Sequence, residues 1–181
     1  MTAPPPEQIL HTTAEDRRIA ALAAAAVGLS LAEAAIPSPL PGVKAGLANI
    51  VTLLVLYQYG WRVALWITLL RVVASALALG LFLTPTFILS LAGALTSLAV
   101  LAPLTRLPPR WFGPAGLSML AAAAHLMGQL VVVDLWLLPG IALAPLIPPL
   151  AVAAGVTGLV NGLVAAAMLR QNAMLADGDT P

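Results

Sequence analysis

Cysteine is absent from this chain of 181 residues, and charged residues make up only 8% of it. The lack of cysteine excludes disulfide bonds and thiolate chemistry, and it leaves the redox compartment undecided. Soluble domains carry charges on about a quarter of their residues, so a chain with 61% hydrophobic residues is not expected to be soluble. The net charge of +1 does not come from a basic patch, and nothing indicates a nucleic-acid partner.

Several catalytic motifs are missing as well. The sequence has no glycine-rich phosphate loop ending in Lys-Ser or Lys-Thr, so the chain is not expected to hydrolyse ATP. Its apolar stretches hold no pair of aspartates that could bind magnesium against a diphosphate, and no cluster of metal ligands surrounds His125. Ser118, His125 and Asp134 do not predict a catalytic triad, because Asp134 is expected at the outer surface. We therefore expect no cofactor, no metal and no catalysis by this chain alone.

Long apolar stretches fill the rest of the sequence. A span of the ~30 Å hydrocarbon core needs about 20 apolar residues. Six stretches approach or exceed this length, the second being short: 19–36, 43–59, 61–82, 85–104, 112–135 and 149–169. They predict one all-α integral membrane domain over residues 17–170, a bundle of six transmembrane helices, with flexible cytoplasmic tails at 1–16 and 171–181.

The positive residues indicate the orientation of this bundle. Cytoplasmic loops of membrane proteins are enriched in lysine and arginine. If the amino terminus is inside, six arginines lie on the cytoplasmic side and one lysine outside: Arg17, Arg18, Arg62, Arg106, Arg110 and Arg170 against Lys44. We therefore expect a multi-pass protein of the cytoplasmic membrane with both termini inside. The alternative is a cleaved signal peptide, because Ala32-Glu33-Ala34 has the form of a cleavage site.

Residues 136–148 are apolar but interrupted by four helix breakers, Pro139, Gly140, Pro145 and Pro148. Lipid-exposed irregular backbone would leave unpaired amide groups, so such a segment fits an outer loop or a re-entrant segment that covers a cavity. A plain interfacial loop is the alternative.

Small residues recur at every fourth position of the first apolar stretch, at Ala20, Ala24, Gly28 and Ala32. Such stripes let helix backbones approach closely in lipid, where the hydrophobic effect gives no help. The stripe fits either packing inside the bundle or docking onto a second membrane protein. Gly158 and Gly162 in the last stretch are open to the same two interpretations.

Polar residues inside apolar stretches are costly, and they are candidates for a binding site. A charge at the centre of a span costs roughly 2.5–3.5 kcal/mol on insertion scales, so such groups usually face the bundle interior with a partner. Arg71 is the most expensive, and we expect it to pair with Glu33 or with an anionic ligand. Glu33 and Lys44 form either an ion pair at the helix ends or a ligand-facing pair. Asn49 can share a helix face with Thr52, as helix glue or as a ligand contact.

The fifth and sixth stretches carry polar pairs at helical spacing. His125 and Gln129 are four residues apart and stack on one face, beside Gly128, and Thr157 and Asn161 repeat this spacing. Both pairs fit interhelical hydrogen bonds or a shared cavity. Together with Arg71 and Lys44, they favour an anionic or zwitterionic small solute, with Glu33 as an internal counter-ion.

These residues carry a family resemblance that covers about residues 17–169. The run Pro41-Gly-Val-Lys-Ala-Gly-Leu-Ala-Asn-Ile50, with Glu33 before it and Gly60 after it, resembles the signature of the Gx transporter family, also labelled heptaprenyl diphosphate synthase component I. Arg71, His125 with Gln129, and the segment 155–162 match as well. Leu126 departs from the pattern, where a second polar residue, asparagine, is expected.

The resemblance implies a six-helix protein similar to the substrate-binding S components of energy-coupling-factor transporters. Such a subunit would capture a solute from outside and dock on a transmembrane coupling subunit with its ATPases. Ala20, Ala24 and Gly28 would supply the docking motif. We expect the solute to contact Glu33, Lys44, Asn49, Arg71, His125, Gln129 and Asn161. The alternative is a membrane accessory of a polyprenyl synthase in isoprenoid quinone side-chain synthesis, which would use Arg62, Arg106 and Arg110.

Overall fold

The computed structural model describes residues 12–35, 47–104, 113–140 and 142–178. This part of the chain is helical and contains no strand, as predicted. Its α-helices are α1 (Ala14–Ala35), α2 (Leu47–Tyr59), α3 (Trp61–Ala78), α4 (Pro85–Leu104), α5 (Pro114–Val132) and α6 (Ile147–Gly178). A π-helical turn, η1 (Val133–Leu137), extends α5, and a short 3-10 turn, η2 (Ala144–Leu146), precedes α6.

The length and composition of the helices make this a multi-pass membrane protein. Among the described residues, five helices are long and apolar enough to cross a bilayer: α1, α3, α4, α5 with η1, and α6 with η2. The helix α2 has 13 residues, and at 1.5 Å per residue it reaches only about 20 Å of the ~30 Å core. The described part of the chain therefore has five candidate spans, one fewer than the predicted six.

Two helices extend into the predicted tails. The helix α1 begins at Ala14 because Thr13 and Asp16 cap its first turn. The Asp16 amide donates to Thr13 Oγ1 at 3.1 Å, and the Thr13 amide donates to Asp16 Oδ2 at 2.8 Å, which is a reciprocal capping box. The helix α6 continues past Arg170 to Gly178, since no glycine or proline interrupts it after Gly162.

The helix α3 ends at Ala78, four residues before the predicted end of the third stretch. The connection to α4 holds two residues with positive φ, Gly80 at 65° and Leu83 at 61°, a conformation that a right-handed helix cannot include. The Thr84 hydroxyl donates to the Leu81 carbonyl at 2.6 Å and closes this connection before α4 begins at Pro85.

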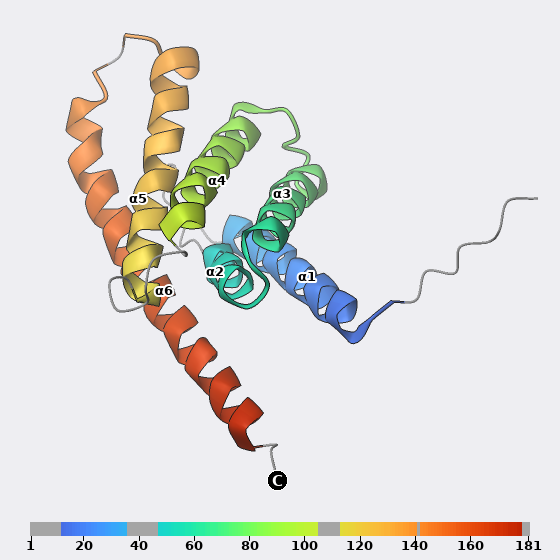
Figure 1. Ribbon diagram of the computed structural model, residues 1–181. Coiled ribbons are helices and arrows are strands. Elements are labelled where there is room, and N and C mark those ends of the chain that lie inside the picture. Colours follow the sequence, from blue (N-terminus) through green and yellow to red (C-terminus); the bar gives the residue numbers. More distant parts are fainter. Residues whose placement is uncertain (1–11, 36–46, 105–112, 141, 179–181) are drawn as a thin grey trace, which may run out of the picture.

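The helices form two groups that meet at α2 (Figure 1). In the first group α1, α2 and α3 pack on one another, and in the second α5 lies between α4 and α6 and packs most extensively on both. Contacts of α2 with α6 and of α3 with α4 join the groups. The main buried core includes Leu53 and Val55 of α2, Leu101 of α4 and Leu117 of α5.

Glycines permit the close approach of α5 and α6. A Cβ atom on Gly162 would lie 2.5 Å from the Ala115 Cα and 3.0 Å from the Pro114 carbonyl oxygen. A Cβ atom on Gly158 would lie 2.9 Å from the Ala122 Cβ. Of the two interpretations of the Gly158 and Gly162 pair, the structure therefore shows packing inside the bundle.

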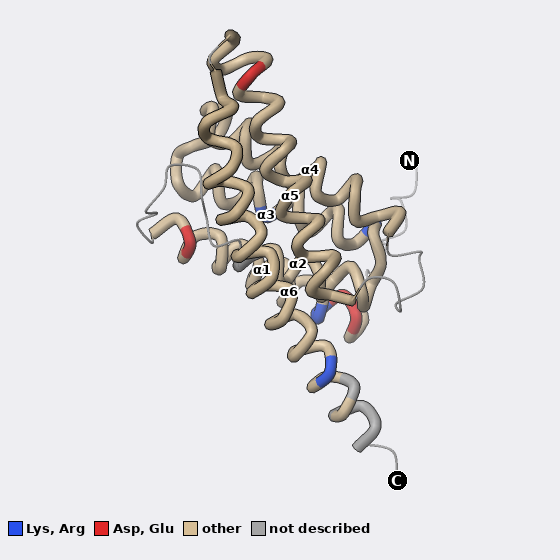
Figure 2. Tube along the Cα trace, turned by 90° about the vertical axis from the view of Figure 1, so that its left-hand side faces the viewer, with Lys and Arg blue, Asp and Glu red and all other residues tan. Residues whose placement is uncertain are grey.

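Many large apolar side chains are exposed, and charged positions are sparse along the helices (Figure 2). Trp66 and Leu70 on α3 are 72% and 54% exposed, and Val152 on α6 is 67% exposed, as expected of side chains that face lipid. The α1 stripe also faces outward: Ala20, Ala24, Gly28 and Ala32 are all exposed, and a Cβ atom on Gly28 would meet nothing within 4 Å. The stripe does not pack against the described part of the bundle.

The two glycine environments of α6 predict opposite effects of one substitution. Gly162→Ala should destabilise the protein by about 1–3 kcal/mol, because the added methyl group overpacks the contact with α5. Gly155→Ala is the matched control, since its Cβ would meet nothing within 4 Å and alanine favours the helix. Thermal unfolding of both variants in the same detergent checks this. Equal melting temperatures would contradict the packing assignment.

Candidate functional site

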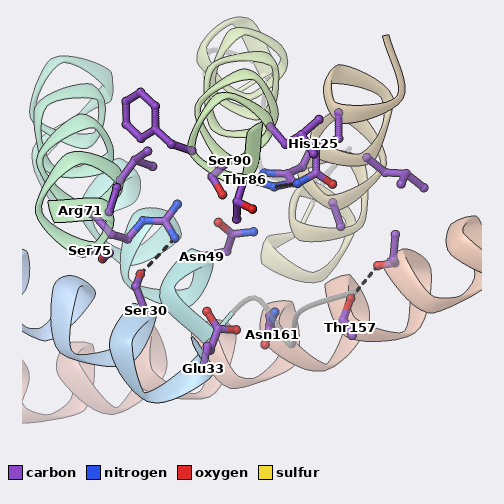
Figure 3. A pocket seen from close by; sticks show the side chains of 18 of the residues that line it. Ser30, Glu33, Asn49, Arg71, Ser75, Thr86, Ser90, His125, Thr157 and Asn161 are labelled. Atoms are coloured by element: carbon purple, nitrogen blue, oxygen red, sulfur yellow. Dashed lines mark hydrogen bonds between the residues drawn. The ribbon is translucent and has the colours of Figure 1, made fainter. Parts of the chain in front are cut away.

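A cavity of about 390 Å³ lies inside the bundle. Each of the six α-helices and the α3–α4 connection contributes to its wall, so the two helix groups enclose it together. Figure 3 shows polar side chains pointing into this space from several helices. The polar lining residues are Ser30, Glu33, Asn49, Arg71, Ser75, Thr86, Ser90, Ser118, His125, Gln129, Thr157 and Asn161.

The cavity brings together six of the seven residues that the sequence predicts as ligand contacts: Glu33, Asn49, Arg71, His125, Gln129 and Asn161. These residues come from five helices, all but α4. Lys44 lies outside the described residues. The shared location is a geometric finding, and the role of these side chains in binding a ligand stays a prediction.

Arg71 projects from α3 into the cavity (Figure 3). Its Nη1 atom donates to Ser30 Oγ on α1 at 3.5 Å, and the Glu33 carboxylate, one turn further along α1, attracts the guanidinium electrostatically. Within the described part of the chain, no hydrogen-bond partner meets the buried Arg71 Nε or the Ser75 hydroxyl one turn away. Buried polar groups normally have partners, so these two atoms mark a place in the cavity wall where a partner is missing among the described residues.

Opposite Arg71, His125 and Gln129 form a pair on α5 (Figure 3). Gln129 Nε2 lies 3.2 Å from His125 Nε2, with donor and acceptor roles that depend on the imidazole tautomer. The imidazole packs directly on the backbone of α4, because a Cβ atom on Gly93 would lie 2.5 Å from His125 Nε2. Gly93 therefore makes room for the His125 ring.

A threonine holds α4 against α5 beside this pair. The Thr96 hydroxyl lies 2.9 Å from the Ala124 carbonyl oxygen on α5 and also 2.9 Å from the Ala92 carbonyl oxygen of its own helix. Gly128 faces this hydroxyl with no room for a side chain. The position of His125 between Ala124 and Gly128 is thus determined by close backbone packing.

Some predicted polar residues take structural roles instead. Thr52 and Thr68 are buried, with their hydroxyl oxygens 3.5 Å apart between α2 and α3. Thr157 lines the cavity but donates back to the Ala153 carbonyl at 2.9 Å. Such back-bonding satisfies a hydroxyl inside an apolar helix.

The sequence analysis missed several of the lining residues. Ser30, Thr86 and Ser90 were not singled out, and Ser118 was considered only for a triad. A single serine or threonine in an apolar helix gives almost no signal, because its hydroxyl can bond to its own backbone. Asp134 is exposed in η1 and does not line the cavity, which agrees with the rejection of that triad.

The segment 136–148, which was predicted to cover the cavity, contributes none of its described residues to the wall. The α3–α4 connection contributes Leu79 and Leu81 instead. The described residues of 136–148 thus have no place in the cavity wall, which favours the alternative of a plain loop. The proline breaks of that segment serve the α5–α6 turn, where Gly140 has a φ of 79°.

The lining offers one guanidinium, one carboxylate, amides, hydroxyls and an imidazole, which suits binding of a small polar molecule. Among the described residues, no three histidine, aspartate, glutamate or cysteine side chains are grouped to hold a metal ion. The groups that the lining does offer can act on a bound molecule by hydrogen bonds and charge.

Comparison with known proteins adds one finding. The model of the family described as heptaprenyl diphosphate synthase component I matches residues 22–168 of this chain. No curated protein and no solved structure matches it. The matched range contains every polar residue that lines the cavity.

Because His125 packs on Gly93 of α4, a methyl group added at position 93 should displace the imidazole. Gly93→Ala should push the imidazole out of its place and separate it from Gln129, at a cost of about 1–3 kcal/mol in stability. In a His11→Gln background, the ¹⁵N imidazole signals report His125 alone, because the chain has 2 histidines. Gly28→Ala is the control, since its Cβ meets open space. Unchanged imidazole signals in Gly93→Ala would refute the contact.

Proposed function

The chain belongs to the heptaprenyl diphosphate synthase component I family, and from this premise we propose that it is a non-catalytic membrane subunit that binds a small solute and acts through partner proteins. The family description names one component of a synthase, which agrees with the prediction that this chain alone is not an enzyme. The observation that carries the binding role is the cavity, where Arg71 and polar side chains from separate helices converge.

The size of the cavity supports a small ligand. Ligand pockets hold roughly 300–1,000 Å³, and the 390 Å³ cavity is near the lower end of this range. A solute with a few polar groups fits such a space, whereas a long polyprenyl chain does not fit inside it. In this proposal the cavity serves a solute, and any synthase contact uses another surface.

The topology completes the proposal. We count α2 as a sixth span, shorter than the hydrocarbon core, which the bilayer or neighbouring helices accommodate. Antiparallel neighbours then place the starts of α1 and α3 and the end of α6 on one side. These ends carry Arg17, Arg62 and Arg170, and the positive-inside rule makes that side cytoplasmic. Both termini are then inside the cell, and the protein belongs to the cytoplasmic membrane.

Two partner systems fit such a subunit. In the first, the protein is an S-component-like part of an uptake transporter, and the outward stripe Ala20, Ala24 and Gly28 docks on a transmembrane coupling subunit with its ATPases. In the second, it is a membrane accessory of a heptaprenyl or polyprenyl diphosphate synthase in isoprenoid quinone side-chain synthesis. The family description supports the synthase accessory better than the uptake transporter. The cavity is the feature that supports the uptake transporter.

Ligand binding is tested with a low-molecular-weight extract of the native cells. A ligand present at about 100 times its Kd adds about 2.7 kcal/mol of stability. The extract should therefore raise the melting temperature of the purified protein, and Arg71→Ala and Lys44→Ala should each reduce this rise. Arg62→Ala, at an exposed position on α3, is the control. A full rise in both folded variants would show that the site is elsewhere.

The two partner systems are separated by purification of a tagged copy from native membranes in mild detergent, followed by mass spectrometry. Ala24→Leu with Gly28→Leu should remove an ATPase-containing partner without unfolding the protein, because both positions are exposed. Charge reversal at Arg62, Arg106 and Arg110 should instead release a synthase.

The control for both variants is Ala151→Leu, an exposed position on α6. Retention of ATPases in the α1 variant would contradict docking through the stripe. Retention of a synthase after charge reversal would contradict docking through the cytoplasmic arginines.

A further inference from the structure

Side chains of opposite charge line the cavity. Among the described lining residues, Arg71 is the cation and Glu33 the anion, and they act on each other electrostatically. Their charges cancel, so the described wall of the cavity has no net charge apart from any proton on His125. In the low dielectric of a bundle interior, an unbalanced ligand charge is expensive. The wall is therefore matched to a ligand that has both signs of charge.

One end of such a ligand has a defined anchor. Ser30 binds Nη1 of Arg71, and Nε is a buried guanidinium donor without a partner among the described residues. Ser75 lies four residues after Arg71, one turn along α3, and its hydroxyl is also without a partner there. A planar carboxylate has two oxygens, and it can accept from Arg71 Nε and from the Ser75 hydroxyl together.

Apolar side chains fill the wall between the polar groups. Val72, Ala76 and Phe87 lie on the side of α3 and α4, and Leu126 and Leu150 on the side of α5 and α6. Resting on the function proposed above, we propose that the ligand is a net-neutral zwitterion with an apolar body, such as an amino acid with an apolar side chain. Its carboxylate binds Arg71 and Ser75, and its ammonium group lies toward Glu33.

The same arrangement disfavours a diphosphate. A diphosphate carries more than one negative charge, and the described wall offers a single guanidinium whose charge Glu33 already offsets. The repulsion between Glu33 and a diphosphate in a low dielectric opposes binding further. The described lining thus favours a zwitterion over the charged head of a prenyl diphosphate, even in a member of a family named for a prenyl diphosphate synthase component.

Matched probes test the zwitterion assignment on the purified full-length protein. Each amino acid is paired with the carboxylate that lacks its amino group, leucine with isocaproate and phenylalanine with hydrocinnamate, and inorganic pyrophosphate is the third probe. At least one amino acid should raise the melting temperature of the protein. Its matched carboxylate and pyrophosphate should each raise the melting temperature by a smaller amount. Arg71→Gln should weaken amino-acid binding about tenfold or more, as loss of a charge-assisted hydrogen bond implies.

Glu33→Gln distinguishes a zwitterion from a simple anion. It should weaken binding of the amino acid and strengthen binding of the matched carboxylate, because the repulsive charge is removed. Ser75→Ala removes one hydroxyl without changing the charge, so it tests the anchor even if Arg71→Gln does not fold. The controls are Arg62→Gln on the same helix and Ser97→Ala, a buried serine of α4 outside the cavity. Neither control should change binding.

The outcomes separate this inference from the function proposed above. Pyrophosphate binding that depends on Arg71 would overturn the zwitterion and leave the cavity as the binding site. A rise in melting temperature with the native extract, but with none of the amino acids, would also overturn the zwitterion and leave the cavity as the binding site. No response to the extract or to any probe would overturn the binding function as well.

Discussion

The burial of one guanidinium, that of Arg71, is the constraint on which the site depends. A charge in the middle of an apolar helix is stable only if the bundle surrounds it with polar partners. The hydroxyl of Ser30 and the carboxylate of Glu33, both on α1, meet this need from a neighbouring helix. The contact of α1 with α3 is therefore electrostatic as well as apolar, and it forms one wall of the cavity.

The opposite wall, formed by α4, α5 and α6, depends on glycines at the contacts between these helices. Gly93 and Gly128 let α4 and α5 approach, and Gly158 and Gly162 let α5 and α6 approach. This dense second group holds His125 and Gln129 in place, because their helix cannot shift without steric overlap. A closely packed group of three helices thus faces the group that carries Arg71, and the polar cavity is lined by both groups (Figure 3).

The inside and the outside of the bundle carry different kinds of information about function. Inside, the paired charges and the small volume match a small solute. Outside, an exposed stripe of small residues on α1 and arginines near helix ends are the surfaces that our proposal assigns to other proteins. A component that binds a solute and depends on partners combines both features. The family description agrees with such a component and does not require that the cavity bind an isoprenoid.

Most of the helices and six cavity residues were predictable from the sequence, because lipid makes local patterns decisive. An apolar stretch must form a helix to satisfy its backbone, and a polar residue within it must face inward. Arg71, Glu33, His125 and Gln129 could therefore be assigned to an interior site without knowledge of the packing. The short helix α2 was also visible as the shortest stretch.

The tertiary structure decided what local patterns leave open. The small residues at four-residue spacing on α1 and α6 look alike in the sequence, yet the α6 glycines pack on α5 and the α1 stripe faces outward. Ser30, Thr86 and Ser90 joined the site only when the helices were assembled, since a lone hydroxyl can bond to its own helix. The sequence by itself determined which residues must avoid lipid. Helix packing determined which of them meet, because contacts between helices depend on rotation and crossing that no single helix encodes.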